Sequence, residues 1–190
     1  MSALALSEES GDEMLQSEVL GSLSLYHLLA AEAPATPPHV RIEQLAAALH
    51  TARQARDRGR AARGGGESAR ELTNLAVALL SAKPAAEWGA AAEAAEAAPL
   101  LETAVELAAQ TEDVQQSVRT HHARSALLEA RGDVEAAAEG LERASAMHAA
   151  WQPHSREGAR LAIVAAGHHR AGRWAEKLET LKALLAMLPP

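Results

Sequence analysis

The chain has 190 residues, a formal net charge of −7 and no cysteine. The missing cysteines exclude disulfides and cysteine-ligated metal sites, and the acidic balance argues against a general nucleic-acid binder. Alanine makes up roughly a quarter of the residues and phenylalanine is absent, so stability must come from closely packed helices of high propensity rather than from an aromatic core.

The N-terminal segment argues against export. Residues 1–14 carry four acidic residues and no basic one, whereas a secretory signal begins with positive charge. No uninterrupted apolar run approaches the roughly 18 residues that a membrane-spanning helix needs. We therefore expect a soluble, cytoplasmic protein with no membrane partner.

Helical periodicity dominates the first part of the chain, and no alternating strand pattern appears. A helix is predicted over 12–32, and the proline-rich stretch 33–38 ends it. Its apolar face consists of Leu15, Val19, Leu23, Tyr26 and Ala30. A second helix is marked by Ile42, Leu45, Leu49 and Ala52. We expect its buried part to stop near Ala52, and Gly64–Gly66 to end it as a hinge or loop.

The later segments complete an all-α chain. A third helix is predicted over 67–82, with Leu72, Leu75, Ala76 and Leu79 facing inward. An alanine-rich stretch then runs to Pro99, which either kinks the helix or starts a new one. Four more helices are predicted near 113–131, 133–150, 155–171 and 173–187. We divide the chain into an N-terminal helical hairpin with an acidic leader and a glycine-rich hinge, residues 1–66, and a repeat region, residues 67–190.

A repeat with an offset of 40 residues runs through the second half. Leu101-Glu102-Thr103-Ala104 recurs as Leu141-Glu142-Arg143-Ala144 and, more loosely, as Leu181-Lys182-Ala183-Leu184. The same offset relates Ala97 to Ala137, Gly132 to Gly172 and Val134 to Trp174. Because a single helix pair cannot bury its apolar face alone, repeated pairs are expected to stack.

This pattern resembles the tetratricopeptide repeat, in which a turn glycine precedes alternating large and small residues of a second helix. The matching residues are Gly132, Val134, Ala137, Leu141 and Ala144, and again Gly172, Trp174, Leu181 and Pro189. Two features depart from the family: the spacing exceeds its usual value of about 34, and Lys177 and Leu184 stand at small-residue positions. The resemblance implies antiparallel helix hairpins stacked as a short α-solenoid, which binds a protein or peptide partner.

The resemblance also implies a binding face. In such arrays the first helix of each unit lines the concave side. The polar residues that this register places there are Arg119, His122, Glu129, His169 and Arg170. Arg119, His122 and Arg170 are suited to hold a peptide carboxylate or an acidic side chain. The alternative is that they are ordinary surface residues.

Four arginines share one face of the second helix, at i, i+3, i+7 and i+10. They are Arg53, Arg56, Arg60 and Arg63. Three interpretations stay open: the row is a helix end that leaves the protein body, it pairs with the acidic N-terminus, or it binds an anion or nucleic acid through phosphate contacts. No aromatic residue is interleaved for base stacking, so nucleic acid is the less favoured partner.

The final helix is apolar where a repeat array normally presents a polar outer face. The residues concerned are Leu181, Leu184, Leu185 and Met187. We predict that this end is an interface, either for a partner or for a second copy in a homodimer.

No pattern in the sequence names a reaction. The nine histidines include no pair at i, i+4, so no metal site is predicted. Gly64–Gly66 lacks the Lys-Ser/Thr that a phosphate loop requires. We therefore predict a non-enzymatic interaction scaffold without metal or cofactor. A nucleic-acid-associated protein and a helical enzyme or metal-binding bundle are the alternatives.

Overall fold

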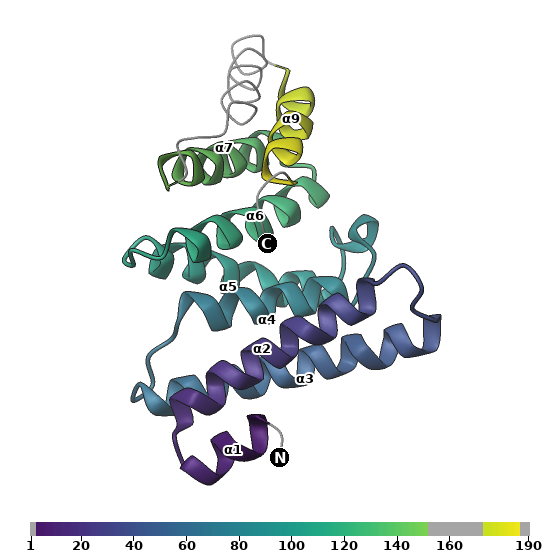
Figure 1. The fold of residues 1–190 in the computed structure, drawn as a ribbon. Coiled ribbons are helices and arrows are strands. Elements are labelled where there is room, and N and C mark those ends of the chain that lie inside the picture. The colour runs from purple at the N-terminus through teal and green to yellow at the C-terminus, as the bar shows by residue number, and fades with distance from the viewer. Residues whose placement is uncertain (1–2, 152–172, 187–190) are drawn as a thin grey trace. The chain divides into compact units, whose positions relative to one another are not determined.

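A computed structural model describes residues 3–151 and 173–186. Within these ranges every regular element is helical, which confirms the predicted all-α class (Figure 1). The elements are α1 (Ala3–Ser10), α2 (Glu13–Glu32), α3 (Pro38–Ala62), α4 (Ala69–Ser81), the 3-10 helix η1 (Ala85–Glu87), α5 (Ala92–Ala108), α6 (Val114–Ala130), α7 (Val134–Trp151) and α9 (Trp174–Ala186). The helix predicted near 155–171 lies outside the described residues.

Two helices end at glycines for the same local reason. Gly64 follows α3 with a φ of 63°, and Gly132 follows α6 with a φ of 85°. In each case the next residue donates its N–H to the carbonyl five positions back, at 2.7 Å after α3 and 2.9 Å after α6. This arrangement is a Schellman turn, which needs a left-handed residue that glycine adopts without strain.

Aspartates begin α2 and α6. Asp12 Oδ1 accepts the backbone N–H of Met14 at 2.9 Å and that of Leu15 at 3.0 Å, and Asp113 caps α6 through the N–H of Gln116. Such caps satisfy the free N–H groups of a first turn. Asp12 belongs to the predicted acidic leader, and the residues before it form α1, a helix that the sequence analysis did not predict.

The segment between α4 and α5 is anchored by a tryptophan. The Trp88 indole N–H lies 2.8 Å from the carbonyl oxygen of Leu80 and 3.0 Å from that of Lys83. These contacts satisfy carbonyls that the end of α4 leaves without helical partners. The next helix, α5, begins at Ala92 and contains Pro99 in its interior, so Pro99 does not start a new helix.

The chain packs as two units, Met1–Leu107 and Ala108–Pro190. In the first unit α3 packs along α2, α1 packs against α2, and α4 packs against both α2 and α3. The four residues of α4 that were predicted to face inward are all buried, as expected. Packing thus groups α4 with the hairpin that precedes it, whereas the sequence pattern predicts a division after residue 66.

Small residues hold the α2–α3 hairpin together. The hydroxyls of Ser17 and Ser24 on α2 lie 2.8 and 2.9 Å from the backbone carbonyls of Ala55 and Ala48 on α3. These pairs show that the two helices run antiparallel. They also show that the backbones approach closely enough for a serine to bridge them.

The apolar faces expected for these two helices coincide only in part with the packed faces. Ala52 is buried and Leu23, Leu45 and Leu49 are half-buried, but large residues near the turn between the helices are exposed. Tyr26 and Ile42 are 64% and 69% exposed. The buried part of α3 also continues past Ala52, through Ala55 and Gly59. The physical reason is the close approach of the two backbones where Ser17 and Ser24 meet α3, because large side chains at these contacts would separate the helices.

The second unit has a core of its own. α7 packs against α6 and α9, and the buried core residues are Ala137, Ala138, Leu141, Ala144 and Leu178. Lys177, 40 positions after Ala137, is also fully buried. Its ammonium group lies 2.6 Å from the Glu142 carboxylate and 5.0 Å from the centre of the Trp174 ring. A lysine can occupy this position because an ion pair and a cation–π contact compensate for its burial.

Candidate interaction surfaces

All four arginines of the α3 row are ion-paired within the first unit. The pairs are Arg53–Glu96, Arg56–Glu67, Arg60–Glu67 and Arg63–Glu71. Arg56 donates hydrogen bonds to both carboxylate oxygens of Glu67, with 2.7 Å between its Nη2 and Glu67 Oε1. The hydrogen bonding to Glu67 raises the pKa of Arg56. The N-terminal segment supplies none of these four partners. Its Glu13 lies 3.9 Å from Arg58, which is not part of the row.

The Arg63–Glu71 pair is the most buried of the four. The Arg63 and Glu71 side chains are 25% and 9% exposed. The other carboxylate oxygen of Glu71 lies 2.8 Å from the Ser17 hydroxyl, so one carboxylate joins α2, α3 and α4. A Cβ on Gly59 would overlap this carboxylate. We call Arg63, Glu71 and Ser17 the charged lock, because together they connect the three helices. Gly59 has no side chain and so leaves room for the Glu71 carboxylate.

The peptide-binding residues carried over from the resemblance are only partly described. Arg119 and His122 lie exposed on α6. Glu129 is engaged in an ion pair with Lys182 of α9, with 2.6 Å between the charged atoms. His169 and Arg170 lie outside the described residues. The assignment of a peptide site to this face remains a prediction.

The predicted C-terminal interface is also partly described. Leu181, Leu184 and Leu185 belong to α9, but the structure describes only their backbone. Met187 lies outside the described residues. Leu178, one turn earlier, is 3% exposed and belongs to the core of the second unit. This interface too remains a prediction.

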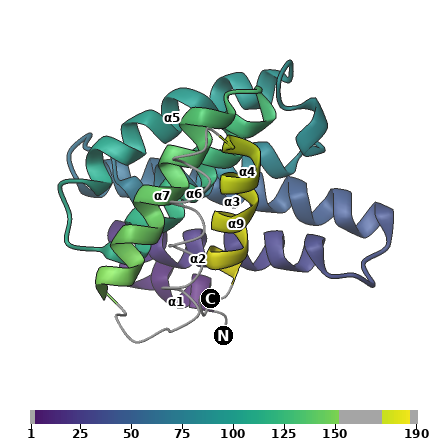
Figure 2. The ribbon, with the colours of Figure 1, turned by 90° about the horizontal axis from the view of Figure 1, so that it is seen from above.

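A different apolar surface is exposed on the first unit, and the sequence analysis did not identify it as a site. Its residues are Leu25, Tyr26, Leu29 and Ile42, whose exposed fractions run from 40% to 69%. They lie at the end of α2 and the start of α3, where the hairpin projects beyond α4 (Figures 1 and 2). We call these four residues the hairpin-tip surface. In the sequence, Tyr26 and Ile42 lie on apolar helix faces, a pattern that also predicts packing against a neighbouring helix.

Carboxylates bracket this surface along α2. Glu18, Leu25, Leu29 and Glu32 are all exposed and follow one another at i, i+7, i+11 and i+14. At 1.5 Å per residue, the two glutamates are about 21 Å apart along one stripe of the helix. The leucines are therefore flanked by negative charge at both ends.

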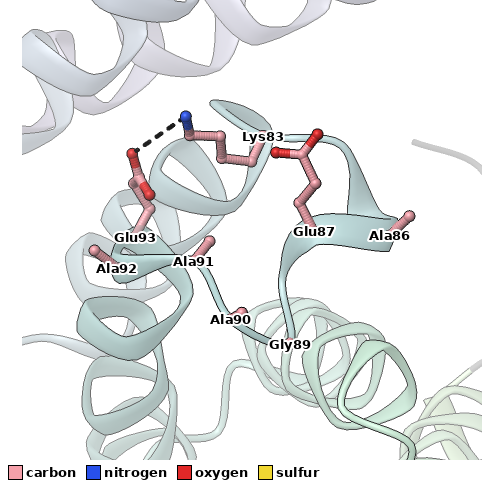
Figure 3. A pocket seen from close by; sticks show the side chains of 8 residues that line it. All are labelled: Lys83, Ala86, Glu87, Gly89, Ala90, Ala91, Ala92 and Glu93. Carbon is pink, nitrogen blue, oxygen red and sulfur yellow. Dashed lines mark ion pairs between the residues drawn. The ribbon is translucent and has the colours of Figure 1, made fainter.

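An open hollow of 600 Å³ lies between the end of α4 and the start of α5 (Figure 3). Its lining residues are Lys83, Ala86, Glu87, Gly89, Ala90, Ala91, Ala92 and Glu93. Lys83 lies 4.0 Å from Glu93. The ionisable groups of the hollow are Lys83, Glu87 and Glu93, and the remaining lining residues are alanines and a glycine.

Metal and membrane sites were also sought in the part of the chain that the structure describes. It contains no group of three or more histidine, aspartate or glutamate residues placed to hold a metal ion. None of its helices combines the length and apolar character that crossing a bilayer requires.

Comparison with known proteins gives no relative. No family model, curated protein or solved structure matches the chain. The tetratricopeptide resemblance therefore remains a prediction, and any functional argument must rest on the surfaces of this chain itself.

Proposed function

We propose that this protein is a non-enzymatic interaction module that binds a helical segment of a partner protein on the hairpin-tip surface. The observation that carries the proposal is the exposure of Leu25, Tyr26 and Leu29 in the last two turns of α2 and of Ile42 in the second turn of α3. Exposed apolar clusters of this kind mark interaction sites, and tyrosine is enriched in the buried centres of interfaces. In this proposal the repeat-like second unit is part of the scaffold.

The packing of α4 suggests why the partner segment would be helical. α4 lies against α2 and α3 and buries Leu72, Leu75 and Leu79, which are spaced at i, i+3 and i+7. The same two helices continue past α4 to the hairpin-tip surface (Figure 1). A second amphipathic helix with that leucine spacing would suit the exposed continuation.

Charge specifies the partner further. Glu18 and Glu32 flank the two exposed leucines, so the complementary helix carries lysine or arginine on either side of its apolar residues. The formal net charge of −7 favours encounter with such a basic segment. A second copy of the chain is less suitable, because two identical α2 stripes would bring like charges together.

The nucleic-acid alternative gains no support from the arginine row. Each of its four guanidinium groups already has a carboxylate partner. Phosphate binding there would have to displace those carboxylates. The hairpin-tip surface therefore carries the functional proposal.

Site-specific photo-crosslinking tests the proposal. A photoreactive amino acid replaces Tyr26 in the full chain, and a matched control carries it at the exposed Glu139 of α7. In extract of the source cells we expect the Tyr26 probe, but not the control, to capture a lysine- or arginine-rich helical segment, as mapped by mass spectrometry. Leu25→Glu together with Leu29→Glu should abolish the crosslink. Capture of a second copy, with a dimer by light scattering, would overturn the proposal, as would equal capture by the control.

A further inference from the structure

The α6–α7 hairpin buries three polar side-chain atoms that have no hydrogen-bond partner among the residues that the structure describes. They are Nδ1 of His121, Oγ of Ser125 and Oγ of Ser145. The three residues are 6%, 1% and 6% exposed. Buried polar atoms are nearly always hydrogen-bonded, so three such atoms in one helix pair require an explanation.

The two helices approach closely at this place. A Cβ on Gly140 of α7 would overlap the Ser125 hydroxyl of α6. The imidazole of His121 lies one helical turn before Ser125 on the same helix. A charged ring here would therefore be held in a tightly packed interface with no hydrogen-bond acceptor at Nδ1.

The charges that act on His121 make protonation still less favourable. Burial lowers the pKa of His121, and the positive charges of Arg143 on α7 and Arg124 on α6 lower it further. The other charged or titratable groups on the packed elements are Arg119, His122 and Glu129 on α6, Glu135, Glu139, Glu142 and His148 on α7, and Glu176, Lys177, Glu179 and Lys182 on α9. Lys177 pairs with Glu142 and Lys182 pairs with Glu129. No carboxylate is among the groups that shift His121.

We propose that the α6–α7 hairpin is an acid-sensitive latch, which stays closed while the buried imidazole of His121 is neutral and loosens when this ring takes up a proton. The bound proton would add a positive charge that Arg143 and Arg124 repel, in a site where no described residue accepts a hydrogen bond from Nδ1. The latch is independent of the proposed partner on the first unit.

The direction of the pH effect follows from linkage. The unfolded chain binds a proton at His121 near pH 6.5, whereas the folded chain binds it only at lower pH. The stabilising effect of the neutral ring is complete above the unfolded pKa and is lost as pH falls through the folded pKa. Between the two values, the equilibrium shifts toward the open state by at most about tenfold per pH unit.

Urea unfolding at pH 7.5 and 5.5 tests the latch. Trp88→Phe removes the tryptophan of the first unit, so that fluorescence then reports the second unit, where Trp174 packs against the core. In this background we expect the urea midpoint to fall at pH 5.5. His121→Gln should reduce the fall, whereas the matched control His148→Gln should retain it in full. The pKa of His122 is lowered as well, by burial and by Lys182, so His122→Gln is not a control. A fall of the same size in His121→Gln would overturn the proposal.

An NMR titration keeps the test decisive if His121→Gln does not fold. The imidazole resonance of His121 is followed in the unmodified full chain between pH 8 and pH 5. A titration midpoint below 6.5, accompanied by faster amide exchange in α6 and α7 at low pH, supports the latch. A midpoint at or above 6.5 overturns it.

Discussion

The hairpins α2–α3 and α6–α7 use the same packing principle but differ in how they satisfy their polar groups. Both bury serine and alanine where larger side chains would separate the helices. In α2–α3 the Ser17 and Ser24 hydroxyls reach carbonyls of the opposite helix. In α6–α7 the Ser125 and Ser145 hydroxyls find no partner within the described ranges. The comparison shows that a small-residue interface determines how closely two helices pack, and the register determines whether their polar atoms are paired.

The first unit adds a charged lock that has no equivalent among the described α6–α7 contacts. Glu71 of α4 reaches both Arg63 and Ser17, and Gly59 leaves room for it. We therefore expect the first unit to be the more stable of the two and the less sensitive to pH between 5.5 and 7.5.

The largest expected effect is the loss of this lock. Glu71→Ala leaves Arg63 without its partner in a largely buried position, and we expect it to lower the free energy of unfolding by about 3 kcal/mol. Urea titration measures the loss, and hydrogen exchange should locate it in α2–α4. The control is Glu139→Ala at an exposed position on α7. A change in Glu71→Ala no larger than that of the control would show that the pair is not a lock.

An intermediate effect is expected at the α6–α7 contact. Gly140→Ala forces its methyl group against Ser125, and overpacking of this kind lowers stability by about 2 kcal/mol. Adding Ser125→Ala removes the hydroxyl that the methyl group would meet, so the double variant should recover most of the loss. A double-mutant cycle measures this coupling. Strictly additive effects would argue against the close contact.

The smallest effects on stability are expected for single serine substitutions, and their signs should differ between the two hairpins. Ser24→Ala removes a hydrogen bond between helices and should lower stability by about 1 kcal/mol. Ser125→Ala removes a buried hydroxyl that has no partner and should leave stability unchanged or raise it. Chemical denaturation of the two single variants decides the matter. Equal losses of stability in the two variants would mean that the serine hydroxyls of both hairpins are hydrogen-bonded to a similar extent.

Helix boundaries could be predicted because local chemistry sets them. The helix predicted over 12–32 is α2, with Asp12 as its cap, and the one predicted near 113–131 is α6, with Asp113 in the same role. The glycine run ends α3, as the sequence indicated. Each signal acts within four or five residues of the chain, so no tertiary information is needed to recognise it.

The candidate sites could be predicted less well, because their state depends on distant residues. Arg56 and Arg63 were recognised as a row, but their carboxylate partners arrive from the loop after α3 and from α4. The hairpin-tip surface could not be predicted, because Tyr26 and Ile42 belong to apolar helix faces of the kind that normally pack against other helices.

Local chemistry in the sequence therefore determined that the chain is helical and where its helices start and stop. Only the tertiary structure decided which face of each helix is buried and which charges are paired. The physical reason is that capping and propensity act between near neighbours in the chain, whereas burial and pairing depend on the register between helices. In α2–α3 that register follows from the close approach of serine, alanine and glycine, which leaves Leu25 and Leu29 outside.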